Sequence, residues 1–218
     1  GLTDAKTFGT GSLMIGDTTT GTIDAANYNT GLGVDIFAAL TSGDENTAIG
    51  AFSLGAVTTG RYNTGLGKGT LEATTTADSN TAVGTNAMQS NTTGQHNVAV
   101  GDGALDANTT ASYNTAVGRA ALGANTTGEY NTAVGYLALE DNTTGERNTG
   151  VGRLSIGNNT TGSYNTGIGY SSLAVNTTAS FNTGLGYSAL AVNTTGATNT
   201  AVGSLTLDAN TTGGGNTG

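Results

Sequence analysis

The chain contains no cysteine, no proline and no tryptophan among its 218 residues, and His96 is its one histidine. The absence of cysteine excludes a disulfide framework and a thiolate metal site. Basic residues are also scarce, with 6 Lys and Arg against 15 Asp and Glu, which gives a net charge of −9. Such a chain repels phosphate groups, so we expect no nucleic-acid partner. It lacks a run of about 18 apolar residues, so we expect no membrane insertion.

What the chain has in excess is glycine, with 37 residues, and a strict repeat. An asparagine recurs every seventeen residues without insertion or deletion, which is typical of stacked repeats. We number each unit from this asparagine as position 1. Twelve units share this frame, the first being a degenerate unit at 12–28.

The unit at 131–147, NTAVGYLALEDNTTGER, shows where the apolar residues fall. Position 4 is Val, Ile or Leu in every unit, and position 9 is apolar in all but the first. These two columns predict the core, with Val134 and Leu139 in one unit and Val151 and Ile156 in the next. Positions 3 and 8 stay small, which indicates that another backbone or another chain approaches closely there.

Glycine, β-branched residues and the lack of a 3.6-residue period argue against helix. We predict two short strands per unit, one over NTxVG and one around positions 7 to 11, with corners at residues such as Gly135 and Gly145. The fold class is therefore all-β, a parallel β-solenoid or β-roll of twelve 17-residue coils. Strict alternation would put Tyr130 on the same face as Val134, so we expect the alternation to break near Asn131 or Gly135, at a residue with positive φ.

Two asparagine columns are predicted to be structural ladders, because stacked amide side chains can hydrogen-bond along the axis of a solenoid. The first is position 1, with Asn131, Asn148 and Asn165 as examples. The second is position 12, which is apolar or Thr in the first four units and Asn afterwards, as at Asn142, Asn159 and Asn176. A column that exchanges apolar residues for Asn is expected to be buried or half-buried.

The position-12 asparagines also begin NTT triplets, which match the acceptor for N-glycosylation. We favour the ladder, because glycans on successive coils about 4.8 Å apart would collide. The acceptor residues of this alternative are Asn91, Asn108, Asn125, Asn142, Asn159, Asn176, Asn193 and Asn210.

Tyrosines fall only at positions 6 and 17, where charged residues also gather, so they are expected on the outside. They are candidates for recognising a cell-surface receptor or a glycan, or for contacting neighbouring chains, and the sequence leaves this choice open. The residues in question are Tyr130, Tyr136, Tyr164, Tyr170 and Tyr187. Regular Thr columns at positions 2, 13 and 14 offer an alternative, ice binding.

Nothing in the sequence predicts an enzyme, a cofactor or a metal site. His96 occupies the variable position 17, and pieces such as Gly31-Leu32-Gly33 belong to the repeat corner rather than to a phosphate-binding loop. The nine-residue calcium-binding repeat of some β-solenoids is absent. We read residues 1–11 as an N-terminal lead-in or the edge of a fragment, and 12–218 as one continuous array. Because the chain starts without Met and stops three residues into a further unit, we expect it to be a piece of a longer protein.

A single coil looks too thin to be stable alone. Burial of two core residues does not offset the backbone entropy that is lost when seventeen residues are ordered. Burying the small positions 3 and 8 against other copies would supply the difference. We therefore predict a parallel, in-register oligomer, with the chain itself as its main partner.

The units NTAVGYLALEDNTTGER at 131–147 and NTGLGYSALAVNTTGAT at 182–198 resemble repeats of bacterial surface proteins and phage tail fibres. They are also similar to the shorter xxAIGxxAxAxG repeats of trimeric autotransporter adhesin heads. The resemblance implies a homotrimeric structural or adhesive fibre, a shaft or head outside the cell, on the cell surface or on a virion. The alternatives are an ice- or glycan-binding solenoid using Thr or Tyr columns, and a subunit that polymerises head to tail.

Overall fold

The computed structural model describes residues 5–16 and 25–218. The chain divides into two compact parts, which we call the first unit (Gly1–Thr110) and the second unit (Ala111–Gly218). From here on, a single seventeen-residue repeat is called a coil. Within the described residues there are strands and turns but no helix, and thus no helix that could cross a membrane. The first unit holds β1 (Ala5–Phe8), β2 (Ser12–Ile15), β3 (Thr30–Leu32), β4 (Thr47–Ile49), β5 (Thr64–Leu66), β6 (Thr81–Val83) and β7 (Val98–Val100). The second holds β8 (Thr115–Val117), β9 (Thr132–Val134), β10 (Thr149–Val151), β11 (Thr166–Ile168), β12 (Thr183–Leu185) and β13 (Thr200–Val202).

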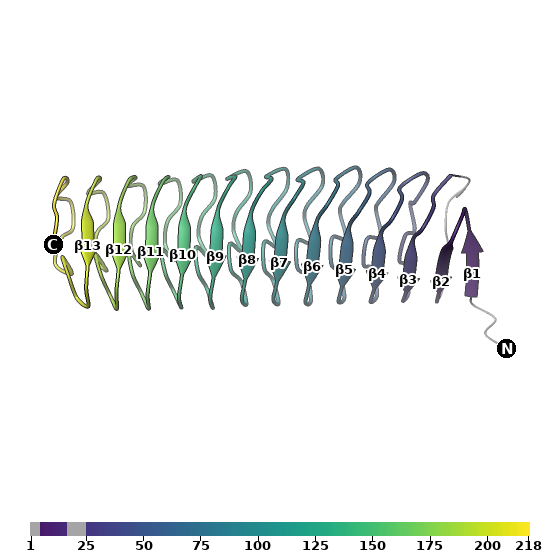
Figure 1. The fold of residues 1–218 in the computed structure, drawn as a ribbon, viewed down its shortest axis with the longest axis horizontal. Helices are drawn as coiled ribbons and strands as arrows, with labels where there is room; N and C mark the ends of the chain where they lie inside the picture. Colours follow the sequence, from purple (N-terminus) through teal and green to yellow (C-terminus); the bar gives the residue numbers. More distant parts are fainter. Residues whose placement is uncertain (1–4, 17–24) are drawn as a thin grey trace. The chain divides into compact units, whose positions relative to one another are not determined.

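Within each unit the strands lie side by side, one per coil, and the chain returns from each strand through a loop to the next (Figure 1). Neighbouring strands are parallel and paired in strict seventeen-residue register, so that Thr149 lies beside Thr132 and Val151 beside Val134. This is the all-β, parallel β-solenoid predicted from the repeat.

The first strand differs, because β1 pairs with β2 in antiparallel fashion. The hairpin covers the edge of β2 that would otherwise present unpaired backbone groups, as a capping element of a solenoid does. The sequence had given no sign of a cap. The degenerate unit at 12–28 and the lead-in at 1–11 lie partly outside the described residues.

The second predicted strand, around positions 7 to 11, is wrong. In the coil after β9 these residues form turns, and Leu137 and Leu139 have φ of 55° and 52°. Their amides still bond across coils, in opposite directions, with Leu137 N donating to Arg119 O (3.1 Å) and Leu139 N donating to Ser155 O (3.0 Å). The backbone polar groups are thus satisfied without an extended conformation.

The predicted positive φ is confirmed near Asn131 and at Gly135, but the predicted break in alternation is wrong, because Tyr130 and Val134 are both exposed and alternate with the buried Asn131 and Ala133. Every glycine at position 5, from Gly16 to Gly203, has φ between 120° and 151°, and Tyr130, directly before Asn131, has φ 59°. A Cβ atom on Gly135 would lie 2.6 Å from Gly152 O of the next coil. Gly145 is different, because its φ is not positive, and a glycine is favoured there by the close approach of Gly162 O and Asn142 Oδ1 to the place of a Cβ.

The interior of each coil is filled by positions 3, 8 and 9, together with the asparagines. Leu139 and Ile156 are fully buried, as predicted, and so are Ala133 and Ala138. The prediction for position 4 is wrong, because Val134 is 37% exposed and Val151 is only half-buried.

The small residue at position 3 explains this reversal. A Cβ on Gly167 would lie 2.6 Å from Ile156 Cγ1, so position 3 must stay small where a bulky side chain fills position 9. Positions 3 and 8 are therefore small because they pack inside one chain, not because a second chain approaches them. Since β-strand side chains alternate, burial of position 3 turns positions 2 and 4 outward.

Candidate interaction surfaces

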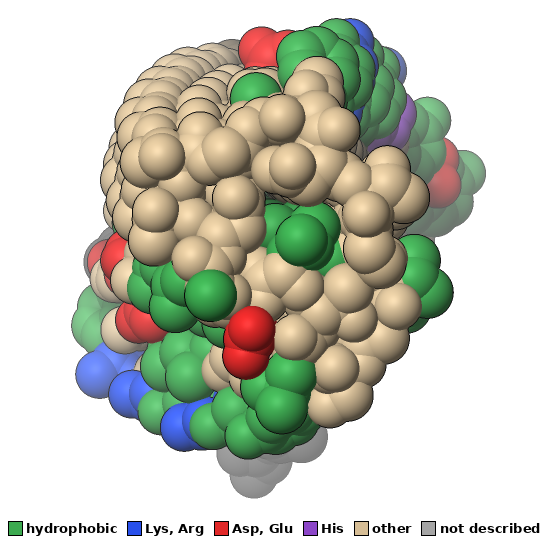
Figure 2. All heavy atoms as spheres, turned by 90° about the vertical axis from the view of Figure 1, so that its left-hand side faces the viewer, with side chains coloured by type: hydrophobic (Ala, Val, Ile, Leu, Met, Phe, Trp, Pro, Cys, Tyr) green, Lys and Arg blue, Asp and Glu red, His purple; other side chains and the backbone are tan. Residues whose placement is uncertain are grey.

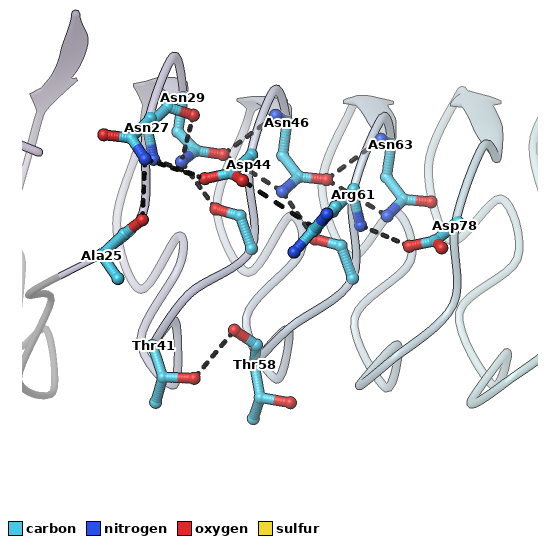
Figure 3. Close-up of polar contacts among 12 residues, drawn as sticks. Ala25, Asn27, Asn29, Thr41, Asp44, Asn46, Thr58, Arg61, Asn63 and Asp78 are labelled. Atoms are coloured by element: carbon cyan, nitrogen blue, oxygen red, sulfur yellow. Dashed lines mark hydrogen bonds and ion pairs between the residues drawn. The ribbon is translucent and has the colours of Figure 1, made fainter. Parts of the chain in front are cut away.

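The position-1 asparagines form a buried ladder, as predicted. Asn148 N donates to Asn131 Oδ1 (2.9 Å), and Asn165 N donates to Asn148 Oδ1 (2.9 Å). The same pattern runs through Asn29, Asn46 and Asn63 in the first unit, where Figure 3 shows the amides stacked coil upon coil.

The position-12 asparagines form a second ladder, also buried. Asn142 Nδ2 donates to Asn125 Oδ1 (2.9 Å), Asn159 Nδ2 to Asn142 Oδ1 (2.8 Å), and Asn176 Nδ2 to Asn159 Oδ1 (3.1 Å). A glycan would have to be attached to the nitrogen that makes these bonds. Seven of the eight NTT asparagines are fully buried and Asn210 is half-buried. In the folded coil the seven buried side chains are therefore not accessible for N-glycosylation.

The Thr columns of the NTT triplets serve the same axial bonding. Thr143 Oγ1 donates to Thr160 O of the next coil (2.9 Å), so the position-13 hydroxyls are occupied within the solenoid. Thr144 at position 14 is exposed. An ice-binding face built from adjacent positions 13 and 14 therefore lacks one of its two hydroxyl columns.

Position 16 carries a polar column on the surface of the first unit. Arg61 N donates to Asp78 Oδ1 (2.7 Å), and Arg61 Nε lies 3.9 Å from Asp44 Oδ2 (Figure 3). Exposed ion pairs of this kind contribute little to stability, about 0 to 1 kcal/mol.

Position 17 of the second unit forms a continuous column of stacked rings around one arginine. The rings of Tyr113 and Tyr130 stack at 5.1 Å, and those of Tyr164 and Phe181 at 5.0 Å. Between these pairs, the Arg147 guanidinium lies 4.9 Å from the Tyr130 ring centre and 5.5 Å from that of Tyr164.

Position 6 of the same unit repeats the arrangement with two arginines. Arg153 lies 5.6 Å and 5.3 Å from the ring centres of Tyr136 and Tyr170, and Arg119 lies 5.7 Å from that of Tyr136. Tyr170 and Tyr187 stack at 5.4 Å. In the view from the C-terminal end, Lys and Arg side chains lie next to hydrophobic side chains on the surface (Figure 2).

The five tyrosines that were predicted as candidates for recognition all lie in these two columns. All five are exposed on the surface, at 41% to 55%. Four of them, however, have an aromatic or guanidinium neighbour on both ring faces, namely Tyr130, Tyr136, Tyr164 and Tyr170. Their faces are therefore covered and only ring edges and hydroxyl groups meet solvent, which disfavours sugar stacking on them. The arginines and Phe181 were missed from the sequence, although their seventeen-residue spacing from the tyrosines was readable.

The outward side of the strands presents an apolar column at position 4 beside a Thr column at position 2. The aliphatic side chains are 36% to 57% exposed in most coils of the second unit, where they are Val117, Val134, Ile168, Leu185 and Val202. The first unit carries the same column, including Leu32 at 51% and Leu66 at 46%. We call this surface, positions 2 and 4 of successive strands, the outer sheet face.

Acidic residues with perturbed titration lie on the loop side of the coils. Burial raises the pKa of Asp106, and the charge of Asp102 raises it further. Burial likewise raises the pKa of Glu140, with Asp141 adding to the effect and Arg119 opposing it. Among the described residues, no three acidic or histidine side chains come together in a set that could hold a metal ion.

Comparison with models of protein families, with curated proteins and with solved structures finds no match to this chain. The fold and the two asparagine ladders define the class of protein to which the chain belongs. The chain is a β-solenoid repeat protein whose coils are held together by asparagine ladders.

Proposed function

We propose that the chain is a segment of a non-catalytic structural fibre outside the cell, a shaft or head of a surface adhesin or phage tail fibre. In this proposal copies associate as a parallel, in-register homotrimer. The observation that carries it is the outer sheet face, where position 4 is aliphatic in every coil and exposed in most of them. Contiguous exposed apolar surface of this kind is rare on monomers and marks a protein interface.

The regular spacing of the coils supports association between copies of the same chain. Each coil offers the same residue types at the same axial interval, about 4.8 Å, so two copies in parallel register match coil by coil within each unit. The resemblance of the repeats to adhesin heads supports three copies rather than two. The proposal places the interface at positions 2 and 4 instead of positions 3 and 8, which are buried within the chain.

Molar mass in solution tests this proposal. Light scattering of the purified chain is expected to give three times the chain mass, independent of protein concentration over the micromolar range. A monomer at all concentrations would contradict it. A dimer would keep the interface but reject the trimer.

A second candidate is ice binding by the same outer sheet face. It is favoured by one observation, the outward Thr column at position 2 beside the aliphatic column at position 4, both at fixed spacing. The two candidates exclude each other, because a trimer that buries this face cannot offer it to ice. A monomer that shapes ice crystals and shows thermal hysteresis would support the second candidate.

A further inference from the structure

A shallow groove of about 680 Å³ lies on the loop side of the first unit, away from the outer sheet face. It is lined by Asp35, Phe52, Glu72 and Gln89, and by small residues such as Gly55 and Ala56. This volume is within the range of small-molecule sites, about 300 to 1,000 Å³.

The groove lies where the coils depart from their own repeat. Position 7, which varies along the chain, is Asp35 and Phe52 here, whereas the coils of the second unit have Ala, Leu or Ser there. Position 12 is Leu40 and Val57 in these coils, in place of the ladder asparagine. The second unit builds regular coils without these residues, so stacking alone does not account for them.

The groove combines an aromatic ring with hydrogen-bonding groups. Phe52 is 39% exposed, so part of its ring faces solvent. Gln89 Nε2 donates to Glu72 Oε2 (2.7 Å), which fixes both side chains and leaves Glu72 Oε1 and Gln89 Oε1 as acceptors. An apolar ring beside fixed acceptors suits a ligand that has an apolar face and a rim of hydroxyl groups.

We propose that this groove binds a short neutral oligosaccharide, with one sugar ring packed against Phe52 and hydroxyl groups donating to Glu72 and Asp35. The charge of the chain selects against acidic sugars, because the groove carries two carboxylates and the whole chain a net charge of −9. All of its lining residues belong to the first unit.

The experiment is a titration of the full chain with four neutral tetrasaccharides, of glucose, mannose, galactose and N-acetylglucosamine, followed by calorimetry or by amide chemical shifts. We expect saturation by at least one of them, with shifts confined to 35–90, and no binding of a sialylated or uronate tetrasaccharide. If none of the four saturates by about 10 mM, the proposal is overturned.

Two matched variants locate the site. Phe52→Asn is expected to weaken binding at least about tenfold, because it removes the ring while Asn tolerates the positive φ of 63°. Phe181→Asn is the control, since Phe181 is also exposed, also has positive φ (60°), and lies in the other unit. Equal binding by wild type and Phe52→Asn would place the ligand elsewhere and overturn the proposal.

A third variant tests whether the two carboxylates act as hydrogen-bond acceptors or through their charge. In the double variant Asp35→Asn, Glu72→Gln the side chains keep an oxygen that accepts from a hydroxyl group, so tetrasaccharide affinity is expected to fall by less than about fivefold. Complete loss of tetrasaccharide binding in this variant would show that the negative charge itself is required and would overturn the proposed role of these residues as acceptors for a neutral sugar.

Discussion

Asn131 and Asn142, which belong to different ladders, donate to the same acceptor within their own coil. Asn131 Nδ2 lies 2.8 Å and Asn142 Nδ2 lies 3.0 Å from Gly145 O. The arrangement recurs at Asn148 and Asn159, which share Gly162 O. One carbonyl in the NTTG segment thus joins the two ladders across the interior, and the coil is closed by side-chain amides where a globular domain would use apolar packing.

The two ladders are predicted to contribute differently to the free energy of unfolding. Asn131→Ala removes the acceptor of the buried Asn148 amide and should destabilise the protein by about 2 to 4 kcal/mol. Asn142→Ala should cost less, about 1 to 3 kcal/mol, because it breaks side-chain bonds only and Gly145 O keeps its bond from Asn131. Urea unfolding followed by circular dichroism measures both, with the exposed Thr144→Ala as control. A larger loss for Asn142→Ala would contradict the shared-acceptor account.

The two corner glycines are predicted to respond differently to alanine. Gly135→Ala should destabilise the protein by about 2 kcal/mol or more, because φ is 140° and the new Cβ would lie 2.6 Å from Gly152 O. A Cβ on Gly145 would lie still closer to a carbonyl, Gly162 O, but Gly145→Ala should cost less, because its φ is not positive and other coils accommodate Ala77 and Ala179 at the same position. Thermal melts of the two variants under one buffer condition compare them directly, and equal losses would show that φ does not matter here.

The sequence was sufficient for the solenoid, its register and both ladders. A strict period of seventeen forces identical residues into axial contact, and among the repeated residues Asn has the groups that can bond to its own copy above and below. The assignment of strand residues to the inward and outward faces was wrong. Tyr130, Thr132, Val134 and Tyr136 alternate as one outward set, but the invariant aliphatic residue at position 4 was assigned to the core.

Position 4 was assigned wrongly because the sequence pattern does not show how narrow the interior of the coil is. Leu139 fills the space opposite position 3, and a Cβ on Gly150 would lie only 3.3 Å from Leu139 Cγ. The turns at positions 7 to 11 were also unpredictable, because Leu residues such as Leu139 are rarely found at positive φ. Here the bonds to both neighbouring coils hold that conformation.

The outer sheet face is predicted to be the site of self-association. The double variant Val134→Lys, Val151→Lys places charges in the middle of the apolar column and should convert the oligomer to a monomer with an unchanged circular dichroism spectrum. The matched control is Thr144→Lys, Thr161→Lys, in the same coils but at the exposed position 14, which should keep the oligomer. Light scattering distinguishes the two, and an oligomer that survives the valine substitutions would move the interface elsewhere.

The arginine in the position-17 column is predicted to act as a substitute for a ring. Arg147→Tyr should change the free energy of unfolding by less than about 0.5 kcal/mol, because the new ring continues the stack between Tyr130 and Tyr164. Arg147→Asp should cost about 1 to 2 kcal/mol through loss of two cation–π contacts. Glu146→Gln, which removes only the exposed ion pair with Arg147, is the control and should be nearly neutral. A large loss in Arg147→Tyr would mean that the charge itself is required.

Asp106 is predicted to lower stability at neutral pH. Its Oδ1 atom is buried and has no hydrogen-bond partner, and burial followed by the charge of Asp102 raises its pKa. In the interval between the unfolded and the raised folded pKa the native state binds more protons, so stability falls as pH rises through it. Asp106→Asn should therefore be more stable than wild type at pH 7, and this advantage should vanish below about pH 3.5, where the carboxyl is protonated in both states. Asp102→Asn should give a smaller gain, because it removes the repulsion but not the burial. Melting temperatures of the three proteins between about pH 3 and pH 8 test this, and a difference that does not change with pH would show that the charge of Asp106 is not its cause.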